Sequence, residues 1–286
     1  MAAPLTACLR FLACLLLAIA CTQARADDTV KVLFVGNSLT YANNLPRLVQ
    51  AIAASQETGP RIATTTFAIP GAELDELWDA GHAATALREG DFDVVVLQER
   101  GGLLRCMAMH RGEPECRRSE RAHRDFVALA DARGARVLLL VAWPPMRPAT
   151  LRDPRRRNAL KEGTLRAYTL LAGRLGSAGG AEIGLVRAAP LLVELAAARG
   201  AEQVLQDDVH PTVLGSLAMA AQLYEAVAAR PPQARKLVLD FPLLPANAAV
   251  QADAPVETQP QLAGDGQRVE VAGEALAPLF AAARGD

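Results

Sequence analysis

After its first 26 residues the sequence has no long hydrophobic run, little net charge and few cysteines. A membrane-spanning helix needs about 20 consecutive apolar residues, and no such stretch follows, so no integral membrane segment is expected. Removal of Arg10 and Arg25 with the leader would lower the Lys and Arg count from 30 to 28 against 31 acids, a formal charge of −3. This balance argues against nucleic acid as a partner.

Residues 1–26 have the pattern of a secretory leader. Arg10 precedes an apolar run from Phe11 to Cys21, which is followed by Ala24-Arg25-Ala26. A positive charge, a short hydrophobic stretch and an Ala-x-Ala end are typical of a cleavable signal peptide. We therefore expect a periplasmic or secreted mature chain. The alternative is a lipoprotein leader that ends before Cys21.

Cysteine is scarce: outside the leader the sequence contains only Cys106 and Cys116. In an oxidising compartment, two cysteines separated by a short polar loop are expected to form a disulfide, and two free thiols are the alternative. A disulfide that closes this loop would add about 2.5–3 kcal/mol on the chain-entropy model. The spacing suits neither a Cys-x-x-Cys redox pair nor a zinc site, and the sequence predicts no metal and no cofactor.

Strand and helix patterns alternate along the chain. Runs of apolar and β-branched residues predict strands at 31–35, 61–68, 93–98, 136–142 and 182–187. Helical spacing predicts helices at 46–55, 72–78, 119–133, 161–175, 190–198 and 212–229. Asn43 and Asn44 are expected to cap the first helix, with Pro46 in its first turn. Alternating strands and helices predict a three-layer α/β fold around a doubly wound, five-stranded parallel sheet.

Two polar motifs fall at predicted strand ends. The first strand stops at Gly36-Asn37-Ser38-Leu39 and passes directly into a helical pattern. In an open α/β sheet, ligands bind at this place, because loops leave the sheet there and helix N-terminal N–H groups point outward unpaired. The second motif, from Asp207 to His210, lies before the last predicted helix of the sheet region.

Together these motifs resemble the SGNH (GDSL-like) hydrolases, whose first block carries a serine in a Gly-Asp-Ser-Leu turn and whose last block reads Asp-x-x-His. The resemblance extends from Lys31 to Arg230 and implies an SGNH/flavodoxin-like sheet. It also implies that Ser38 is a nucleophile, His210 its general base and Asp207 the acid that orients the histidine. Asp208 is the second candidate for that acid. A serine hydroxyl needs such a base within hydrogen-bond reach, and an imidazole with an ordinary pKa of about 6.5 suits the task.

The resemblance further implies an oxyanion hole formed by the backbone N–H groups of Ser38 and Gly71 and by a side-chain amide. Most members of the family carry an asparagine after the third strand, whereas the amide here is Gln98, one methylene longer. Some SGNH carbohydrate esterases also carry glutamine there, which favours a carbohydrate ester as substrate. Glu99 could orient this amide, bind substrate or form an ion pair with an arginine.

The other histidines, His82, His110 and His123, are expected to be structural or solvent-exposed. A cluster of arginines is expected to lie on a helix face exposed to solvent, and the alternative is that it contacts an anionic polymer. The cluster comprises Arg152, Arg155, Arg156 and Arg157.

Irregular structure is expected in three segments. Residues 103–118 read as a basic inserted loop beside the site, and Trp143-Pro144-Pro145-Met146 must be a loop, because paired prolines cannot continue a helix or a central strand.

Residues 27–231 are expected to form the SGNH domain and 232–286 a C-terminal extension. Within it, 246–266 read as a linker or disordered tail, and 269–284 as a short amphipathic helix.

The expected activity is that of a serine esterase that removes short acyl groups, such as acetyl, from a small-molecule or carbohydrate ester through an acyl-enzyme. Three alternatives stay open: an envelope polysaccharide O-acyltransferase, a lipase or thioesterase, and a carbohydrate-binding protein that uses this fold without catalysis.

Overall fold

Five parallel strands form the central sheet, in the order β2-β1-β3-β4-β5. The computed structural model describes residues 29–109, 112–179 and 183–284, so the expected leader and His110 lie outside the described residues. The strands are β1 (Thr29–Gly36), β2 (Arg61–Ala68), β3 (Val94–Leu97), β4 (Arg136–Leu140) and β5 (Ile183–Val186). Their positions and order confirm the predicted doubly wound α/β sheet.

Strand β1 lies inside the sheet, at the point where the strand order reverses. Val32 pairs with Thr64 of β2 on one side and with Val94 of β3 on the other. Residues 32–35 are completely buried, as expected for a parallel sheet covered on both faces. Ligands bind outside the carboxyl ends of strands at such a reversal, so the ends of β1 and β3 mark the expected site.

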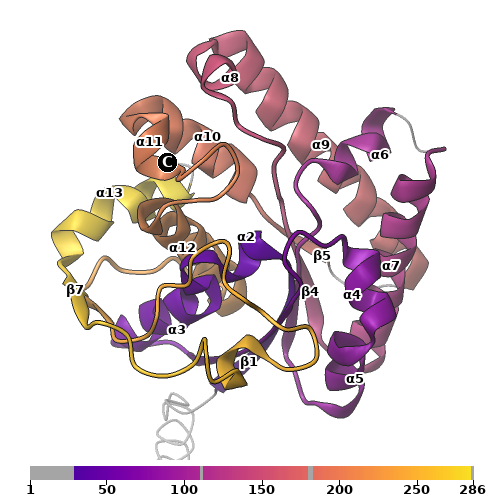
Figure 1. Cartoon of the computed structure of the whole chain (residues 1–286), viewed down its shortest axis with the longest axis horizontal. Coiled ribbons are helices and arrows are strands. Elements are labelled where there is room, and N and C mark those ends of the chain that lie inside the picture. The colour runs from indigo at the N-terminus through magenta and orange to yellow at the C-terminus, as the bar shows by residue number, and fades with distance from the viewer. Residues whose placement is uncertain (1–28, 110–111, 180–182, 285–286) are drawn as a thin grey trace, which may run out of the picture.

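Helices cover both faces of the sheet (Figure 1). One face carries α3 (Leu45–Ser55), α10 (Ala188–Arg199) and α12 (Val213–Ala228), and the other carries α4 (Leu74–Ala80), α5 (His82–Glu89), α7 (Pro114–Ala132) and α9 (Pro154–Gly179). Short helices in the connections are α2 (Ser38–Tyr41), η1 (Ala42–Asn44), α8 (Pro148–Arg152) and α11 (Ala201–Val204). Within the described ranges, no helix has both the length and the apolar character needed to cross a membrane.

Several helix predictions need correction. α9 extends beyond the predicted 161–175 at both ends, and α5, α8 and α11 were not predicted. Asn44 occupies the N-cap position of α3, and Pro46 lies in its first turn as predicted, but neither Asn43 nor Asn44 caps the helix with its side chain. Both asparagines instead have left-handed backbone conformations, with φ of 55° and 56°.

The predicted loop at 103–118 is mostly helical. It contains η2 (Leu103–Arg105), α6 (Cys106–Met109) and the first turns of α7. Pro114 stands in the first turn of α7, where its missing N–H breaks no hydrogen bond. The buried residues of α7 include Cys116, Ser119, His123 and Phe126, which recur at helical spacing. The basic residues that suggested a loop, such as Arg117 and Arg118, lie on the exposed face of this helix.

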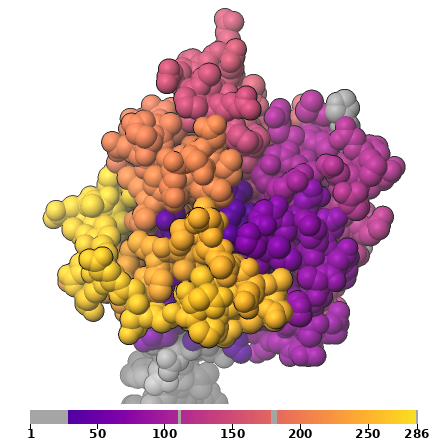
Figure 2. All heavy atoms as spheres, viewed as in Figure 1, coloured from indigo at the N-terminus to yellow at the C-terminus, as the bar shows by residue number. Residues whose placement is uncertain are grey.

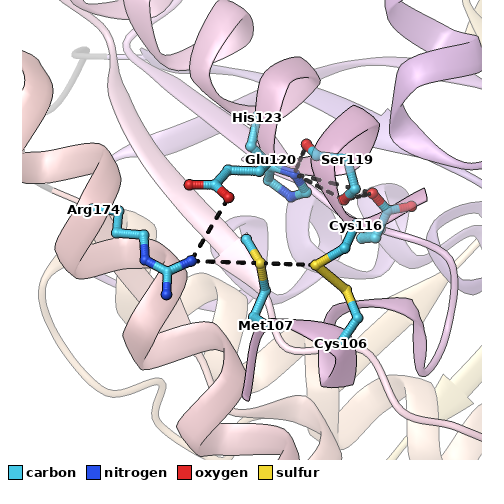
Figure 3. The surroundings of a disulfide bond; sticks show 8 residues. Cys106, Met107, Cys116, Ser119, Glu120, His123 and Arg174 are labelled. Atoms are coloured by element: carbon cyan, nitrogen blue, oxygen red, sulfur yellow. Dashed lines mark hydrogen bonds and ion pairs between the residues drawn. A yellow bond between two sulfur atoms is a disulfide. The ribbon is translucent and has the colours of Figure 1, made fainter. Parts of the chain in front are cut away.

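A disulfide between Cys106 and Cys116 joins α6 to α7, as predicted (Figure 3). Their Cα atoms lie 5.9 Å apart. The Cys116 side chain is completely buried, and Met107 Sδ lies 3.2 Å from Cys116 Sγ and 3.7 Å from the Arg174 guanidinium. The disulfide therefore belongs to the packed layer of helices on one face of the sheet.

The C-terminal extension packs against the domain. Its antiparallel strands are β6 (Leu237–Leu239) and β7 (Val269–Val271), and it ends in α13 (Gly273–Arg284), which packs on α12. Between them, residues 240–268 are irregular apart from η3 (Val256–Thr258). In Figure 2 this orange-to-yellow segment covers much of the face on which the indigo N-terminal elements are recessed.

The prediction of a linker or disordered tail at 246–266 is therefore wrong. Apolar side chains of this segment form a second buried cluster with Tyr41 and Ala68; they are Leu244, Ala248, Val250, Val256 and Leu262. Glu257 also accepts hydrogen bonds from the Thr64 hydroxyl and from the backbone N–H and hydroxyl of Thr66. Because β2 is an edge strand, these contacts cover polar groups that would otherwise remain open to another strand.

Removal of the disulfide is expected to lower the free energy of unfolding by about 2.5–3 kcal/mol, because the unfolded chain regains the entropy of the closed loop. The measurement is denaturant unfolding of a variant with both Cys106→Ala and Cys116→Ala. Wild-type protein unfolded in the presence of reductant should show the same loss, and the double variant should be indifferent to reductant. Equal stability of the wild type with and without reductant would show two free thiols.

Candidate active site

Ser38 is the first residue of α2, separated from the end of β1 at Gly36 by Asn37 alone. The turn before it is fixed by Asn37, whose side-chain oxygen accepts the Leu39 N–H at 3.1 Å and whose carbonyl accepts the Thr40 N–H at 2.9 Å. These bonds are those of a helix N-cap. They hold the serine at the carboxyl end of β1, where the predicted site begins.

The structure brings Ser38, His210 and Asp207 together. Ser38 Oγ lies 2.9 Å from His210 Nε2, and His210 Nδ1 lies 2.9 Å from Asp207 Oδ2. The other carboxylate oxygen, Asp207 Oδ1, accepts the backbone N–H groups of Val209 at 2.6 Å and His210 at 2.7 Å. Asp208, the second candidate for the acid, is exposed and lies outside this chain of hydrogen bonds.

The loop that carries His210 is held from two sides. Trp143 Nε1 donates to the Val209 carbonyl at 2.8 Å, and the Met146 N–H donates to the Asp208 carbonyl at 2.6 Å. The predicted proline-containing loop between these two residues therefore supports the acid–histidine segment.

The carboxyl group of Asp207 favours its ionised form. Partial burial by itself raises its pKa, but hydrogen bonds from the His210 ring and from the N–H groups of His210 and Val209 outweigh this and lower the pKa below its ordinary value. An ionised Asp207 accepts a hydrogen bond from His210 Nδ1–H, which keeps that proton on Nδ1 and leaves Nε2 unprotonated and able to accept a proton from Ser38. This tautomer is the one that base catalysis requires.

Gly71 lies beside the serine turn. Asn37 Nδ2 donates to the Ala72 carbonyl at 2.8 Å, and Gly71 has a φ of +73°, which suits glycine. Among the described residues, no acceptor contacts the backbone N–H of Ser38 or of Gly71. Both groups are therefore available to stabilise a negative oxygen on a bound substrate.

Gln98 lies beneath the serine turn and makes three hydrogen bonds there. Its side-chain oxygen accepts the Asn37 N–H and the Thr40 hydroxyl, each at 2.8 Å, and its Nε2 donates to the Glu99 carbonyl at 2.5 Å. Only 1% of the residue is exposed. The side chain therefore holds the serine turn from inside the protein, and one N–H of Nε2 is taken by the Glu99 carbonyl. Its role as an oxyanion donor stays a prediction.

Glu99 holds the neighbouring turns from inside the protein. Its carboxylate accepts the N–H groups of Leu74 at 3.0 Å and Arg100 at 2.6 Å, together with the Ser119 hydroxyl at 2.5 Å. It is completely buried, so it does not reach substrate. Among the described residues no arginine forms an ion pair with it, and His123 Nδ1 lies 4.0 Å from its Oε2. Burial raises the pKa of Glu99 to about 7.

The remaining predicted residues lie away from the triad. His82 is exposed at the start of α5. His123 is completely buried, where Nδ1 donates to the Ser119 carbonyl at 2.8 Å, and burial lowers its pKa to about 4. The arginine cluster lies on α8 and α9; Arg152, Arg155 and Arg156 are exposed, and Arg157 donates to the Leu151 carbonyl. None of the described His, Cys, Asp and Glu residues gather into a group that could hold a metal ion.

Two hollows flank the Trp143–Met146 loop. One, of about 590 Å³, is lined by residues that include Met146, Asp207 and Asp208. The other, of about 400 Å³, is lined by residues that include Gly101, Gly102 and Pro144. Neither hollow is lined by Ser38, although the larger one reaches Asp207.

No protein-family model matches the sequence, and the search of curated proteins found no match. Solved structures are similar in fold. An acetyl xylan esterase gives a TM-score of 0.51 at 16% identity, covering 69% of this chain and 100% of that one. An alpha/beta hydrolase from the metagenome of Lake Arreo gives 0.50 at 16% identity, with 70% and 95% covered.

A DUF4886 family protein from Bacteroides uniformis gives a TM-score of 0.50 at 13% identity, covering 71% of this chain and 84% of that one. The sheet order and these similarities agree with the fold that the motifs implied. The chain has an SGNH/flavodoxin-like α/β fold. At such low identity the likeness establishes the fold alone.

The sequence did not reveal the contacts of Thr40, Gln98 and Glu99, which hold the turns beside Ser38 from inside the protein. A lone threonine after the serine turn carries no distinguishing pattern. The pair Gln98-Glu99 at a buried strand end was a usable signal, because polar side chains in such a place must find partners. Which partners they find depends on the fold.

Gln98→Ala is expected to lower the free energy of unfolding by about 2–4 kcal/mol as well as turnover, because the Asn37 N–H and the Thr40 hydroxyl lose their buried acceptor and a cavity remains. Thr40→Val, which loses one hydrogen bond and keeps the shape, should cost only about 1 kcal/mol. Thermal unfolding and ester hydrolysis measure the two effects. Unchanged stability of Gln98→Ala with a large loss of turnover would show that Gln98 acts as an oxyanion donor and not as a support of the turn.

Ionisation of Glu99 is expected to destabilise the fold, because its folded pKa of about 7 lies above its ordinary value of 4.5. Stability from this group is present below pH 4.5 and is lost, by about 3 kcal/mol, as the pH rises to about 7. Glu99→Gln does not ionise, so its stability relative to the wild type should rise by that amount over the same range.

The difference between the two proteins is the quantity to measure, by denaturant unfolding at several pH values. His123 titrates with the opposite sign over an overlapping range, since its folded pKa of about 4 lies below its ordinary 6.5. His123 Nδ1 lies 4.0 Å from Glu99 Oε2, but with a folded pKa of about 4 the ring is neutral in the fold over this range in both proteins, so its contribution largely cancels in the difference. A stability difference that does not vary with pH would contradict the raised pKa of Glu99.

Proposed function

We propose that this protein is a serine esterase of the SGNH type that removes short acyl groups, such as acetyl, from a carbohydrate ester. The observation that carries the proposal is the chain of hydrogen bonds from Ser38 Oγ through His210 to Asp207, with 2.9 Å at each step. It stands at the carboxyl end of β1, where the strand order reverses. Asp207, His210 and Ser38 are the proposed catalytic residues.

In the first half of the reaction, Ser38 Oγ attacks the ester carbonyl carbon while its proton passes to His210 Nε2. The carbonyl oxygen becomes negative, and the free N–H groups of Ser38 and Gly71 are the proposed donors to it. Asp207 stabilises the imidazolium. Collapse of the tetrahedral intermediate breaks the bond to the alcohol oxygen, which takes the proton from Nε2, and leaves an acyl group on Ser38.

In the second half, water attacks the acyl carbon and gives a proton to Nε2. Collapse breaks the bond to Ser38 Oγ, which receives that proton, and releases the carboxylic acid. Water is the only other reactant, so the chemistry is complete with the side chains of this chain.

Two observations favour a short acyl group on a carbohydrate. Neither hollow beside the Trp143–Met146 loop is lined by Ser38, so neither offers a pocket for a long acyl chain at the proposed nucleophile. An acetyl xylan esterase of known structure has a similar fold. The disulfide supports an oxidising compartment, periplasmic or extracellular.

Hydrolysis of p-nitrophenyl esters of increasing acyl length tests the proposal. The wild type should act on acetate and lose activity steeply with longer chains. Ser38→Ala should fall to background, and His210→Ala and Asp207→Asn should lose about 10²–10⁴-fold in turnover.

Asp208→Asn is the matched control. Asp208 is exposed one residue from Asp207, so its substitution should change turnover less than about twofold. Full activity of Ser38→Ala would refute the proposed nucleophile. Slow hydrolysis in water alone, together with acyl transfer to a sugar when one is added, would instead identify an acyltransferase.

A further inference from the structure

Asn43 occupies an unusual place, five residues after Ser38. It belongs to η1, between α2 and α3, and its φ of 55° is left-handed. Asparagine tolerates this conformation better than other residues with a side chain, but it still carries a cost. The neighbouring Asn44 shares the conformation. Two such residues in succession require surrounding contacts that hold them.

The contacts of Asn43 join three segments that are distant in sequence. Its Nδ2 donates to the Pro211 carbonyl at 2.8 Å and to the Ser216 hydroxyl at 3.0 Å. Its backbone N–H donates to the Leu244 carbonyl of the C-terminal extension at 2.7 Å. Only 5% of Asn43 is exposed, so the whole residue acts inside the protein.

Pro211 follows His210 directly, so the Asn43 amide binds the backbone next to the histidine. In the part of the chain that the structure describes, residues 37–45 make hydrogen bonds to residues 204–216 only through Ser38 and Asn43. The Ser38–His210 bond itself must open during a reaction. The Asn43 bonds therefore hold the Ser38 turn against the His210 loop while the proton moves. Ser38 and His210 themselves are 172 residues apart in sequence.

The extension holds the turn that carries Asn43. The Tyr41 hydroxyl donates to the Ala246 carbonyl at 2.7 Å, and Asn44 Nδ2 donates to the Pro242 carbonyl at 3.1 Å. Tyr41 is also packed in the apolar cluster that the extension forms with the domain. These bonds reach the extension but not the His210 loop, which distinguishes Asn44 from Asn43.

We propose that Asn43 is a positioning residue, held by the C-terminal extension, that sets the distance between Ser38 Oγ and His210 Nε2. The inference rests on the proposed function, because the pair it positions is the proposed nucleophile and base. A shift of about 1 Å between reacting groups can reduce turnover about 10²-fold. Asn43 thus acts on turnover without touching substrate.

Asn43→Gly is the sharpest test, because glycine keeps the left-handed backbone and the N–H bond to Leu244 but lacks the amide. Turnover of the best p-nitrophenyl ester should fall about 10- to 100-fold, while KM changes less than about threefold. Asn43→Asp, which has the same shape but no amide donor, should be impaired to a similar degree.

Asn44→Gly is the matched control. It makes the same backbone change at a residue with the same φ and removes a hydrogen bond to the extension only. Its turnover should stay within about twofold of the wild type, although thermal unfolding should show a comparable loss of stability in both glycine variants. Equal turnover losses in the two variants, or wild-type turnover in Asn43→Gly, would overturn the inference.

Crystal structures of the two variants give a readout that does not depend on activity. The Ser38 Oγ to His210 Nε2 distance should exceed 3.5 Å in Asn43→Gly and stay near the 2.9 Å of the wild type in Asn44→Gly. An unchanged distance in Asn43→Gly would refute the positioning role. If the distances change as expected but the wild type hydrolyses no ester, the proposed function fails and the positioning role stands.

Discussion

The hydrogen bond from the Asn37 N–H to the Gln98 side-chain oxygen joins the ends of β1 and β3 across the reversal of strand order. The Thr40 hydroxyl donates to the same oxygen, so one buried acceptor fixes both the turn before Ser38 and the first turn after it. Gly36 makes room for this arrangement, because a Cβ there would collide with Thr40 Oγ1 and Gln98 Oε1. The position of Ser38 depends on these contacts.

Glu99 is a second buried acceptor that fixes turns beside the site. A buried carboxyl group is unfavourable unless hydrogen bonds compensate for lost hydration, and here two backbone N–H groups and the Ser119 hydroxyl do so. Those N–H groups, of Leu74 and Arg100, belong to the turns after β2 and β3. Adjacent residues at the end of one strand thus anchor three turns, and the disulfide stabilises the helix that supplies Ser119.

The sequence allowed the sheet and three proposed catalytic residues to be located, because strand ends in a parallel sheet carry local signals: a buried run followed by Gly, Asn, Ser or Asp. Ser38 and His210 meet because the fold brings these ends to one edge. Gln98 could not be placed in the same way. Whether an amide points toward substrate or back into the protein depends on one methylene and on the space above Gly36, neither of which has a periodic pattern. The positioning contacts of Asn43 likewise link residues with no relation in sequence.

The extension shows why composition misled at 246–266. Linker and packed irregular chain share Ala, Pro and Gln, and periodicity detects only regular elements. This segment is ordered by other means: Gln259 is buried and bonds to the backbone of Gln251 and Ala254, while scattered apolar residues fill the space over Tyr41. Because those contacts bear on the turn after Ser38, a chain that ended at residue 231 would lose support at the nucleophile itself. The extension is therefore better regarded as part of the structural unit that forms the site than as an appendage to it.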